Sequence, residues 1–371
     1  MSANYKKLGD YIQPVDVRNS DLKVSHLLGL SIEKCFIESI ANTIGTDFRP
    51  YKIVKKGQFA YGPVTSRNGD KITIALLKEA DVCIISSSYS VFEITDTTKL
   101  LPEYLMLWFS RPEFDRYARY KSHGSVREIF DWDEMCRVEL PVPDLKEQEK
   151  IVKTYNAITK RIQLKQKINE NLEKTAQLIF KETFSNDSND KKIPLYDFAE
   201  YINGTSFEED EYTDEGFPII KIAELKNRIT VDTQYCLGIK DKKFLIKDDD
   251  IVFSWSGNPE TSIDVFVWTH GNAILNQHIF KINTDKKWFM YNLLKFFKPQ
   301  FIRLASGKQT TGLGHITVAD LKKLEFFYKE SLISFYDNKI SSCMQLYTKN
   351  LHEINTLQEL KQLVISKISR N

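Results

Sequence analysis

The sequence lacks several features that would assign a function at once. Its five cysteines lie far apart, with no Cys-x-x-Cys pair and no histidine spaced to complete a zinc site, so we expect reduced thiols in the core. It contains no G-x-x-x-x-G-K-[ST] phosphate loop, and therefore encodes no ATP chemistry. No apolar run approaches the ~20 residues of a membrane helix, and the first residues have no signal-peptide core. We expect a cytoplasmic protein with no membrane partner.

An excess of charge of one sign is also missing. The chain has 52 Lys and Arg against 50 Asp and Glu, which gives a net charge of +2 over 371 residues. A surface that binds nucleic acid would have to be a local patch. Two apparent catalytic motifs are incomplete. The segment SGNPE at 256–260 has a single proline, and Pro143-Asp144 lacks a nuclease continuation, so Asp144 is better interpreted as a helix N-cap. We expect no metal site and a role in recognition rather than catalysis.

The sequence contains the same unit twice, at an offset of about 187 residues. Phe59 matches Ile251, and Phe92 matches Phe280. Longer matches pair SYSVFEI (88–94) with NQHIFKI (276–282), and EYLMLWFSRPEFDR (103–116) with MYNLLKFFKPQFIR (290–303). Alternating apolar stretches predict strands. The aromatic stretch PEYLMLWFSRPEFDRYARY predicts one helix that packs on the core, with a binding face as the alternative. The fold class is α+β, with two similar domains that each contain a small mixed sheet and helices.

A long amphipathic segment follows each unit. Apolar positions recur at alternating steps of four and three, the spacing of a coiled-coil seam, with Lys165 and Asn169 as polar interruptions. The predicted seam residues are Ile151, Tyr155, Ile158, Ile162, Leu172 and Ile179 in the first segment, and Tyr336, Ile340, Tyr347, Ile354, Leu357 and Val364 in the second. We expect the two helices to pack on each other. The alternative is two helices on separate domain cores.

The connection between the repeats predicts the direction of the helices. The first helix would be ~50 Å long, whereas the polar linker reaches at most ~27 Å. The second helix should therefore return antiparallel to the first, giving a pseudo-twofold arrangement of two domains separated by a coiled coil. The expected boundaries are 1–143 for the first recognition domain, 144–184 for the first helical region, 185–192 for the linker, 193–331 for the second recognition domain, and 332–371 for the second helical region.

Polar loops at matching places in the two repeats are the candidate DNA-binding segments. Their side chains are of types that bind base edges and phosphates, although most polar loops are only solvated turns. The acidic run 208–215 should face away from DNA. The candidates are Arg67, Asn68, Lys71, Ser88, Tyr89, Ser125 and Arg127 in the first half, and Trp255, Asn258, Asn276, Gln277, Lys308, Gln309, Thr310, Thr311 and His315 in the second.

The repeat and the phrase LPVPDLKEQEKIV (140–152) resemble the specificity subunits of type I restriction-modification systems. The resemblance covers essentially the whole chain, but the second helix lacks the Pro-rich and Glu-Gln opening. It implies a non-catalytic subunit whose two recognition domains each read half of a bipartite, asymmetric double-stranded DNA target. The helices would set the half-site spacing and dock two methyltransferase subunits.

The same resemblance places every cofactor on other subunits. S-adenosylmethionine would bind the methyltransferase subunits, and ATP and magnesium would bind restriction subunits that act as motor and nuclease. The alternative function is a scaffold that joins two protein partners without reading DNA. An enzyme fused from two degenerate catalytic domains is a more distant alternative.

Overall fold

The computed structural model describes residues 5–39, 43–66, 69, 71–124, 127–184, 191–308 and 312–368. The chain divides into two compact units. The first unit contains residues 1–160 and 358–371, and the second contains residues 161–357. Two long helices, α4 (Leu145–Thr183) and α9 (Glu330–Lys367), contribute a segment to each unit. No helix in the described part of the chain is long and apolar enough to span a membrane.

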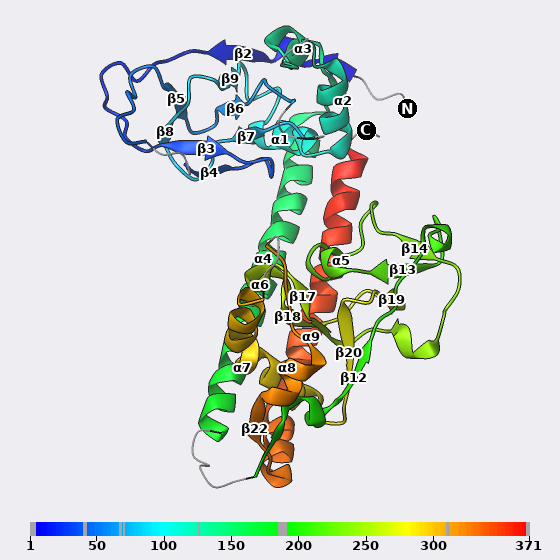
Figure 1. Cartoon of the computed structure of the whole chain (residues 1–371). Coiled ribbons are helices and arrows are strands. Elements are labelled where there is room, and N and C mark those ends of the chain that lie inside the picture. Colours follow the sequence, from blue (N-terminus) through cyan, green and yellow to red (C-terminus); the bar gives the residue numbers. More distant parts are fainter. Residues whose placement is uncertain are drawn as a thin grey trace. The chain divides into compact units, whose positions relative to one another are not determined.

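The first unit is built on an antiparallel sheet with strand order β2-β9-β6-β7, and α1 packs against β7 (Figure 1). Three two-stranded sheets, β1-β10, β3-β4 and β5-β8, complete it. The strands are β1 Tyr5–Lys7, β2 Ile12–Val15, β3 Leu28–Leu30, β4 Phe36–Glu38, β5 Lys52–Lys55, β6 Phe59–Tyr61, β7 Ile74–Leu76, β8 Val82–Ile85, β9 Ser90–Ile94 and β10 Glu139–Pro141. The helices are η1 Leu8–Asp10, α1 Pro102–Phe109, α2 Pro112–Lys121 and α3 Trp132–Arg137.

The second unit has a corresponding antiparallel sheet, β12-β20-β16-β18, and a mixed sheet, β14-β13-β19-β15, in which β13 and β19 are parallel. The pairs β11-β22 and β17-β21 complete it. The strands are β11 Lys192–Pro194, β12 Glu200–Asn203, β13 Phe217–Ile220, β14 Tyr235–Cys236, β15 Leu245–Ile246, β16 Ile251–Ser254, β17 Ser256–Gly257, β18 Asp264–Val267, β19 Ala273–Leu275, β20 Ile279–Asn283, β21 Gly314–His315 and β22 Glu325–Phe327. The helices are η2 Leu195–Phe198, η3 Glu209–Glu211, η4 Lys242–Phe244, α5 Ile222–Asn227, α6 Pro259–Ser262, α7 Lys287–Ser306 and α8 Val318–Lys323.

The two sheets confirm the duplicated α+β architecture and correct one detail of the sequence match. Phe59 on β6 lies opposite Phe92 on β9, whereas Phe253 on β16 lies opposite Phe280 on β20. Since Phe92 and Phe280 are equivalent, the structure pairs Phe59 with Phe253 and not with Ile251. A shift of two residues keeps the same side chains on the core face of a strand, so the apolar pattern alone could not detect it.

The prediction of one helix over 102–120 was wrong, because the structure has two helices, α1 and α2. Between them Arg111 is extended, with φ −77° and ψ 138°, and Pro112 begins α2. A residue before proline is sterically disfavoured in the α conformation, and proline is favoured in the first turn of a helix. The matching Pro299 nevertheless lies inside the continuous helix α7.

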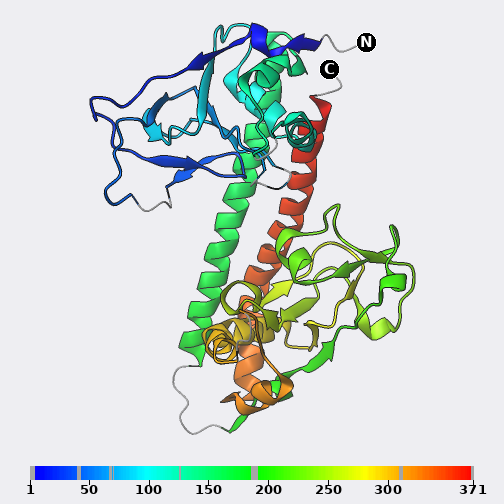
Figure 2. The same ribbon diagram turned by 45° about the horizontal axis from the view of Figure 1, so that its top comes forward.

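The helices α4 and α9 run antiparallel and side by side within the second unit (Figures 1 and 2). Arg161 on α4 binds Glu353 on α9 at 2.6 Å, and farther along α4 the backbone oxygen of Ala176 accepts a 2.9 Å hydrogen bond from Tyr336. Residue numbers therefore rise along α4 as they fall along α9. This confirms the predicted antiparallel coiled coil. None of the twelve predicted seam residues is exposed.

The cysteines only partly match the expectation of buried thiols. Cys83 and Cys236 are buried, and Cys136 and Cys343 are partly buried, but Cys35 is exposed. Cys35 lies in the turn between β3 and β4, outside the sheet core. The expectation was wrong for this residue because its local apolar neighbours belong to an edge hairpin.

Candidate nucleic-acid interface

Five separated segments of the first unit line one hollow, and three of them carry predicted residues or correspond to predicted loops. These three are the residues after β6, the residues before β9, and Arg127; Leu30, Ile32 and Thr73 complete the lining. The hollow has a volume of about 410 Å³ and brings together Ser88, Tyr89 and Arg127, three of the predicted DNA-binding residues. Gly62 permits this close approach, because a Cβ at that position would lie 2.4 Å from the Thr73 hydroxyl and 3.4 Å from the Tyr89 ring. The hollow combines apolar walls with a cation and hydroxyl groups, a combination suited to a base edge and a phosphate.

The other predicted residues of the first unit do not line this hollow. The Lys71 ammonium forms a 2.9 Å ion pair with Glu33, and its side chain is about half exposed. Arg67, Asn68 and Ser125 lie outside the described residues.

The corresponding three segments also converge in the second unit. Trp255 follows β16 and contacts the ring of His278, which precedes β20, with centroids 5.4 Å apart. His315 lies opposite Ser256 in the β17-β21 pair, and the backbone oxygen of Trp255 accepts a 2.8 Å hydrogen bond from Ile316. Corresponding loops therefore come together within each unit, but they carry different side chains in the two units.

The predicted residues around Trp255 make different contacts and therefore have different roles. Gln277 is exposed, and its amide nitrogen lies 3.4 Å from His278. Asn276 is only 9% exposed and belongs to the core side of this segment. Asn258 is exposed, but its side-chain oxygen caps α6 by accepting hydrogen bonds from the backbone of Glu260 and Thr261. Gln277 thus presents its side chain to solvent more freely than either asparagine.

Lys308 has an internal partner. Its ammonium binds both carboxylate oxygens of Asp320, at 2.6 and 2.5 Å, and Asp320 forms the capping box of α8 with Thr317. Burial would raise the pKa of Asp320, but hydrogen bonds from Lys308 and Thr317 outweigh it and hold the pKa below its usual value. Lys308 therefore stabilises the start of α8. Gln309, Thr310 and Thr311 lie outside the described residues.

The structure adds Asn203 to the second site and shows that His278, in the polar loop 276–278, contacts Trp255. The side-chain oxygen of Asn203, the last residue of β12, accepts a 3.1 Å hydrogen bond from the Trp255 indole. The edge of the indole thus has a fixed polar partner, and His278 packs against its ring. Sequence reasoning missed Asn203 because it adjoins Trp255 only through strand pairing.

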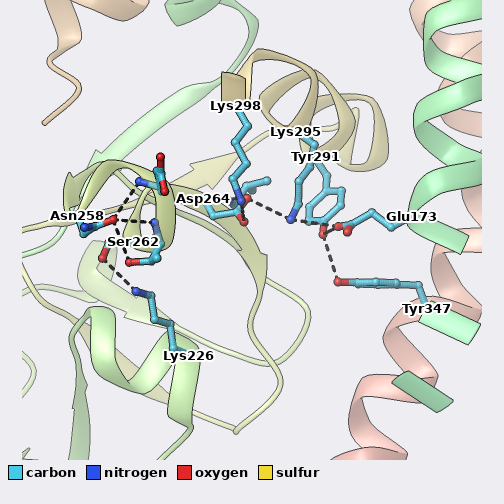
Figure 3. A network of polar contacts seen from close by, with 12 residues as sticks. Glu173, Lys226, Asn258, Ser262, Asp264, Tyr291, Lys295, Lys298 and Tyr347 are labelled. Atoms are coloured by element: carbon cyan, nitrogen blue, oxygen red, sulfur yellow. Dashed lines mark hydrogen bonds and ion pairs between the residues drawn. The ribbon is translucent and has the colours of Figure 1, made fainter. Parts of the chain in front are cut away.

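A network of partly buried polar groups links β18, α7 and α4 (Figure 3). The carboxylate of Asp264, at the start of β18, binds Lys295 at 3.1 Å and Lys298 at 2.5 Å, both from α7. Lys295 also binds Glu173 of α4 at 3.1 Å. Burial would raise the pKa of Asp264, but the two lysines outweigh it and lower the pKa. The pKa of Lys295 is raised, because the two carboxylates outweigh the opposing effect of its burial.

A second polar cluster interrupts the coiled-coil seam. Asn350 donates a 2.8 Å hydrogen bond to Asn169, Asn169 donates to the backbone oxygen of Tyr347 at 3.0 Å, and Lys165 donates to Asn350 at 2.8 Å. The asparagines are 6% and 1% exposed. Both amides thus have partners for their oxygen and nitrogen, as buried polar groups require.

Within the described ranges, no group of three or more His, Cys, Asp and Glu residues is placed to hold a metal ion. The chemistry present at the two loop clusters is that of a polar and aromatic binding surface.

Comparison with known proteins places this architecture in a family. A family model described as the type I restriction modification DNA specificity domain matches residues 41–174 and 188–362. The MjaIX type I restriction enzyme specificity subunit of Methanocaldococcus jannaschii is 23% identical over 299 residues, covering 72% of this chain and 68% of that protein. The HindI specificity subunit of Haemophilus influenzae is 27% identical over 135 residues, 36% of this chain and 29% of that protein.

A solved structure shares the fold. The crystal structure of the type I restriction-modification S subunit from M. genitalium gives a TM-score of 0.56 at 12% identity, covering 99% of this chain and 96% of that one. The family model covers most of the chain, in two segments that correspond to its two repeats. The chain belongs to the family of type I restriction-modification DNA specificity proteins.

Proposed function

We propose that this chain is the DNA sequence-specificity subunit of a type I restriction-modification complex. Each recognition domain reads one half of a bipartite target. The observation that carries the proposal is that corresponding loops of the two repeats converge in both units with different side chains, Tyr89 and Arg127 in one and Trp255 and His315 in the other. Different side chains at equivalent places select different bases, so the target is asymmetric.

The helices are proposed to set the distance between the half-sites and to dock two methyltransferase subunits. The predicted seam residues are buried or partly buried in the helix pair or against the domain cores, so docking must use other positions. Exposed apolar side chains on α4 recur at helical spacing at Leu164, Ile168 and Leu178, with exposed fractions of 52%, 42% and 67%. Such a stripe on a surface helix suits a partner helix.

The division of labour among the subunits is also part of the proposal. This chain is non-catalytic, the methyltransferase subunits bring S-adenosylmethionine, and the restriction subunits bring ATP and magnesium. The domain boundaries are proposed as 1–143, 144–184, 185–192, 193–331 and 332–371. Contacts to double-stranded DNA are assigned to the loop residues around Tyr89 and Trp255.

The proposal is tested with the purified full chain, alone and mixed with its methyltransferase subunits. We expect no methylation by the chain alone and methylation of one gapped motif by the complex. Arg127→Ala should change discrimination in one half of that motif, and Trp255→Ala should change it in the other. Val231→Ala is the control, because Val231 is fully exposed in the second unit.

The changes should be specific to one half because each loop cluster belongs to one unit. A wrong base pair in a protein–DNA site typically costs about 1–3 kcal/mol, so loss of a reading residue should remove a discrimination of that size. Strong methylation by the isolated chain would reject the proposal. A complex that forms but never binds DNA selectively would favour the scaffold alternative.

A further inference from the structure

Asp264 lies where the second DNA-reading loop leaves the sheet. It begins β18 and pairs with Ser254, the last residue of β16, immediately before Trp255. Asn258 and α6 fill the connection between the two strands (Figure 3). The backbone at Asp264 therefore forms one end of the segment that presents Trp255, and any shift of Asp264 moves that segment.

Two lysines of α7 hold the Asp264 carboxylate. Lys295 binds one carboxylate oxygen at 3.1 Å, and Lys298 binds the other at 2.5 Å. Lys295 is bound in turn by Glu173 of α4 at 3.1 Å, and Glu173 accepts a 2.5 Å hydrogen bond from the Tyr291 hydroxyl. A continuous series of polar contacts thus joins α4 to the base of the reading loop (Figure 3).

The partial burial of this series makes each charge depend on the others. The Lys295 and Asp264 side chains are only 16% and 17% exposed. The carboxylates of Glu173 and Asp264 balance the ammonium groups of Lys295 and Lys298. Neutralising Glu173 therefore leaves this group of side chains with a net charge of one positive unit. Lys295 then has Asp264 as its remaining ion-pair partner in this network. Because the ion pair to α4 is lost, Lys295 and the α7 segment that carries it are held less firmly against β18.

In the first repeat the positions that match Lys295 and Glu173 carry no charge. Trp108 occupies the place of Lys295, and the equivalent of Tyr291 is Tyr104, whose hydroxyl donates a 3.0 Å hydrogen bond to the backbone oxygen of Pro141. The position of Glu173 in the helical repeat corresponds to Gln358 on α9. An effect transmitted through Glu173 should therefore reach only the second recognition domain.

We propose that Glu173 is a positioning residue for DNA reading by the second domain. Through Lys295 it holds Asp264, and thereby sets the geometry of the loop that carries Trp255. This inference rests on the proposed function, because it concerns how accurately one half of the DNA target is read. It assigns to a helix residue outside the loop cluster a role in sequence specificity.

Glu170 provides a matched control. It lies one turn before Glu173 on α4, is exposed, and lines the same surface hollow of about 490 Å³, together with Lys174 and Leu178. Glu173→Gln and Glu170→Gln remove the same charge from the same face of the same helix. Only the first removes a charge that binds Lys295. Glutamine at 173 still offers an oxygen to Tyr291, so the comparison isolates the ion pair.

The experiment uses the full chain in complex with its methyltransferase subunits, and DNA duplexes that carry either the methylated motif or a single base-pair change in one half. Binding affinities for matched and changed duplexes give the discrimination in each half. For Glu173→Gln we expect about a tenfold loss of discrimination in the half affected by Trp255→Ala, and an unchanged other half. For Glu170→Gln we expect both halves to stay within about twofold of the unsubstituted complex.

The outcomes separate a positioning role from a general loss of stability. If Glu173→Gln fails to fold, Lys298→Gln tests the far side of Asp264 and should give the same loss in one half. Equal losses in both halves, or a Glu173→Gln complex that matches Glu170→Gln, would overturn the inference. If the unsubstituted complex shows no discrimination in either half, the proposed function fails and not this inference alone.

Discussion

Replacing Asn169 by leucine should lower the free energy of unfolding of the second unit. The size of the loss should depend on whether position 350 still carries an asparagine. The single change deletes two hydrogen bonds, the 2.8 Å bond from Asn350 and the 3.0 Å bond to the Tyr347 backbone oxygen. Asn350 is 1% exposed, so its amide nitrogen would be left without a partner and out of reach of solvent. Leaving a buried polar group unsatisfied costs about 1–3 kcal/mol.

The double replacement should cost less than the sum of its parts. With leucine at both 169 and 350, neither position carries an amide that would be left unpaired in the seam. Lys165 loses Asn350 but keeps its 2.8 Å ion pair with Glu353. Replacing both partners of a buried hydrogen bond by apolar groups can be nearly neutral. The coupling energy between the two sites should therefore be about 1–2 kcal/mol.

Urea denaturation of the full chain, followed by circular dichroism, measures this cycle when the transition of the second unit is resolved. The single variants should unfold at lower urea concentration than the unsubstituted chain, and the double variant should recover much of the difference. Replacing Leu346, an exposed residue of α9, by alanine is the control, and should change the midpoint little. Single variants without a loss of stability, or losses that add in the double variant, would refute the reasoning.

Three further predictions follow from individual contacts. Lys308→Ala should destabilise the second unit by about 1–3 kcal/mol in thermal unfolding, because it leaves the buried Asp320 carboxylate without its cation. Burial, with a contribution from Arg228, lowers the pKa of His270 to about 4. The unfolded state, with a His pKa of about 6.5, then binds the proton more readily, so stability should fall as the pH drops from about 6.5 to about 4, and His270→Asn should reduce that slope. Cys35 should react with a thiol reagent in the folded chain, whereas Cys83, whose pKa burial raises to about 12, should react only after unfolding.

The duplicated fold and the helix pair could be predicted from sequence because both depend on periodic apolar patterns. The steps of four and three in residues 151–179 are a property of the chain itself, and a seam of that kind has one efficient way to be buried. Details that depend on register or on backbone geometry could not be predicted. The exchange of Ile251 for Phe253 as the equivalent of Phe59 preserves the apolar face, and the break at Pro112 contrasts with the unbroken helix at Pro299.

The sequence indicated loops that the structure brings together, but not the contacts of each residue in them. The repeat marks corresponding loops in both halves, and in the first unit Tyr89 and Arg127 from two of these loops line one hollow. Whether a polar side chain faces solvent or an internal partner depends on tertiary contacts. Asn258 caps a helix, and Lys308 binds Asp320. Asn203 contacts Trp255 only because β12 and β16 flank the same strand, β20.

Mapping methylated bases across the genome of the host, with and without this gene, tests the central claim that two unlike domains read one split DNA target. The account predicts a gapped motif with two different halves, methylated only when the gene is present. Trp255→Ala should alter the bases required in one half and leave the gap and the other half intact. A methylation pattern unchanged by loss of the gene, or a continuous motif without a gap, would contradict the account.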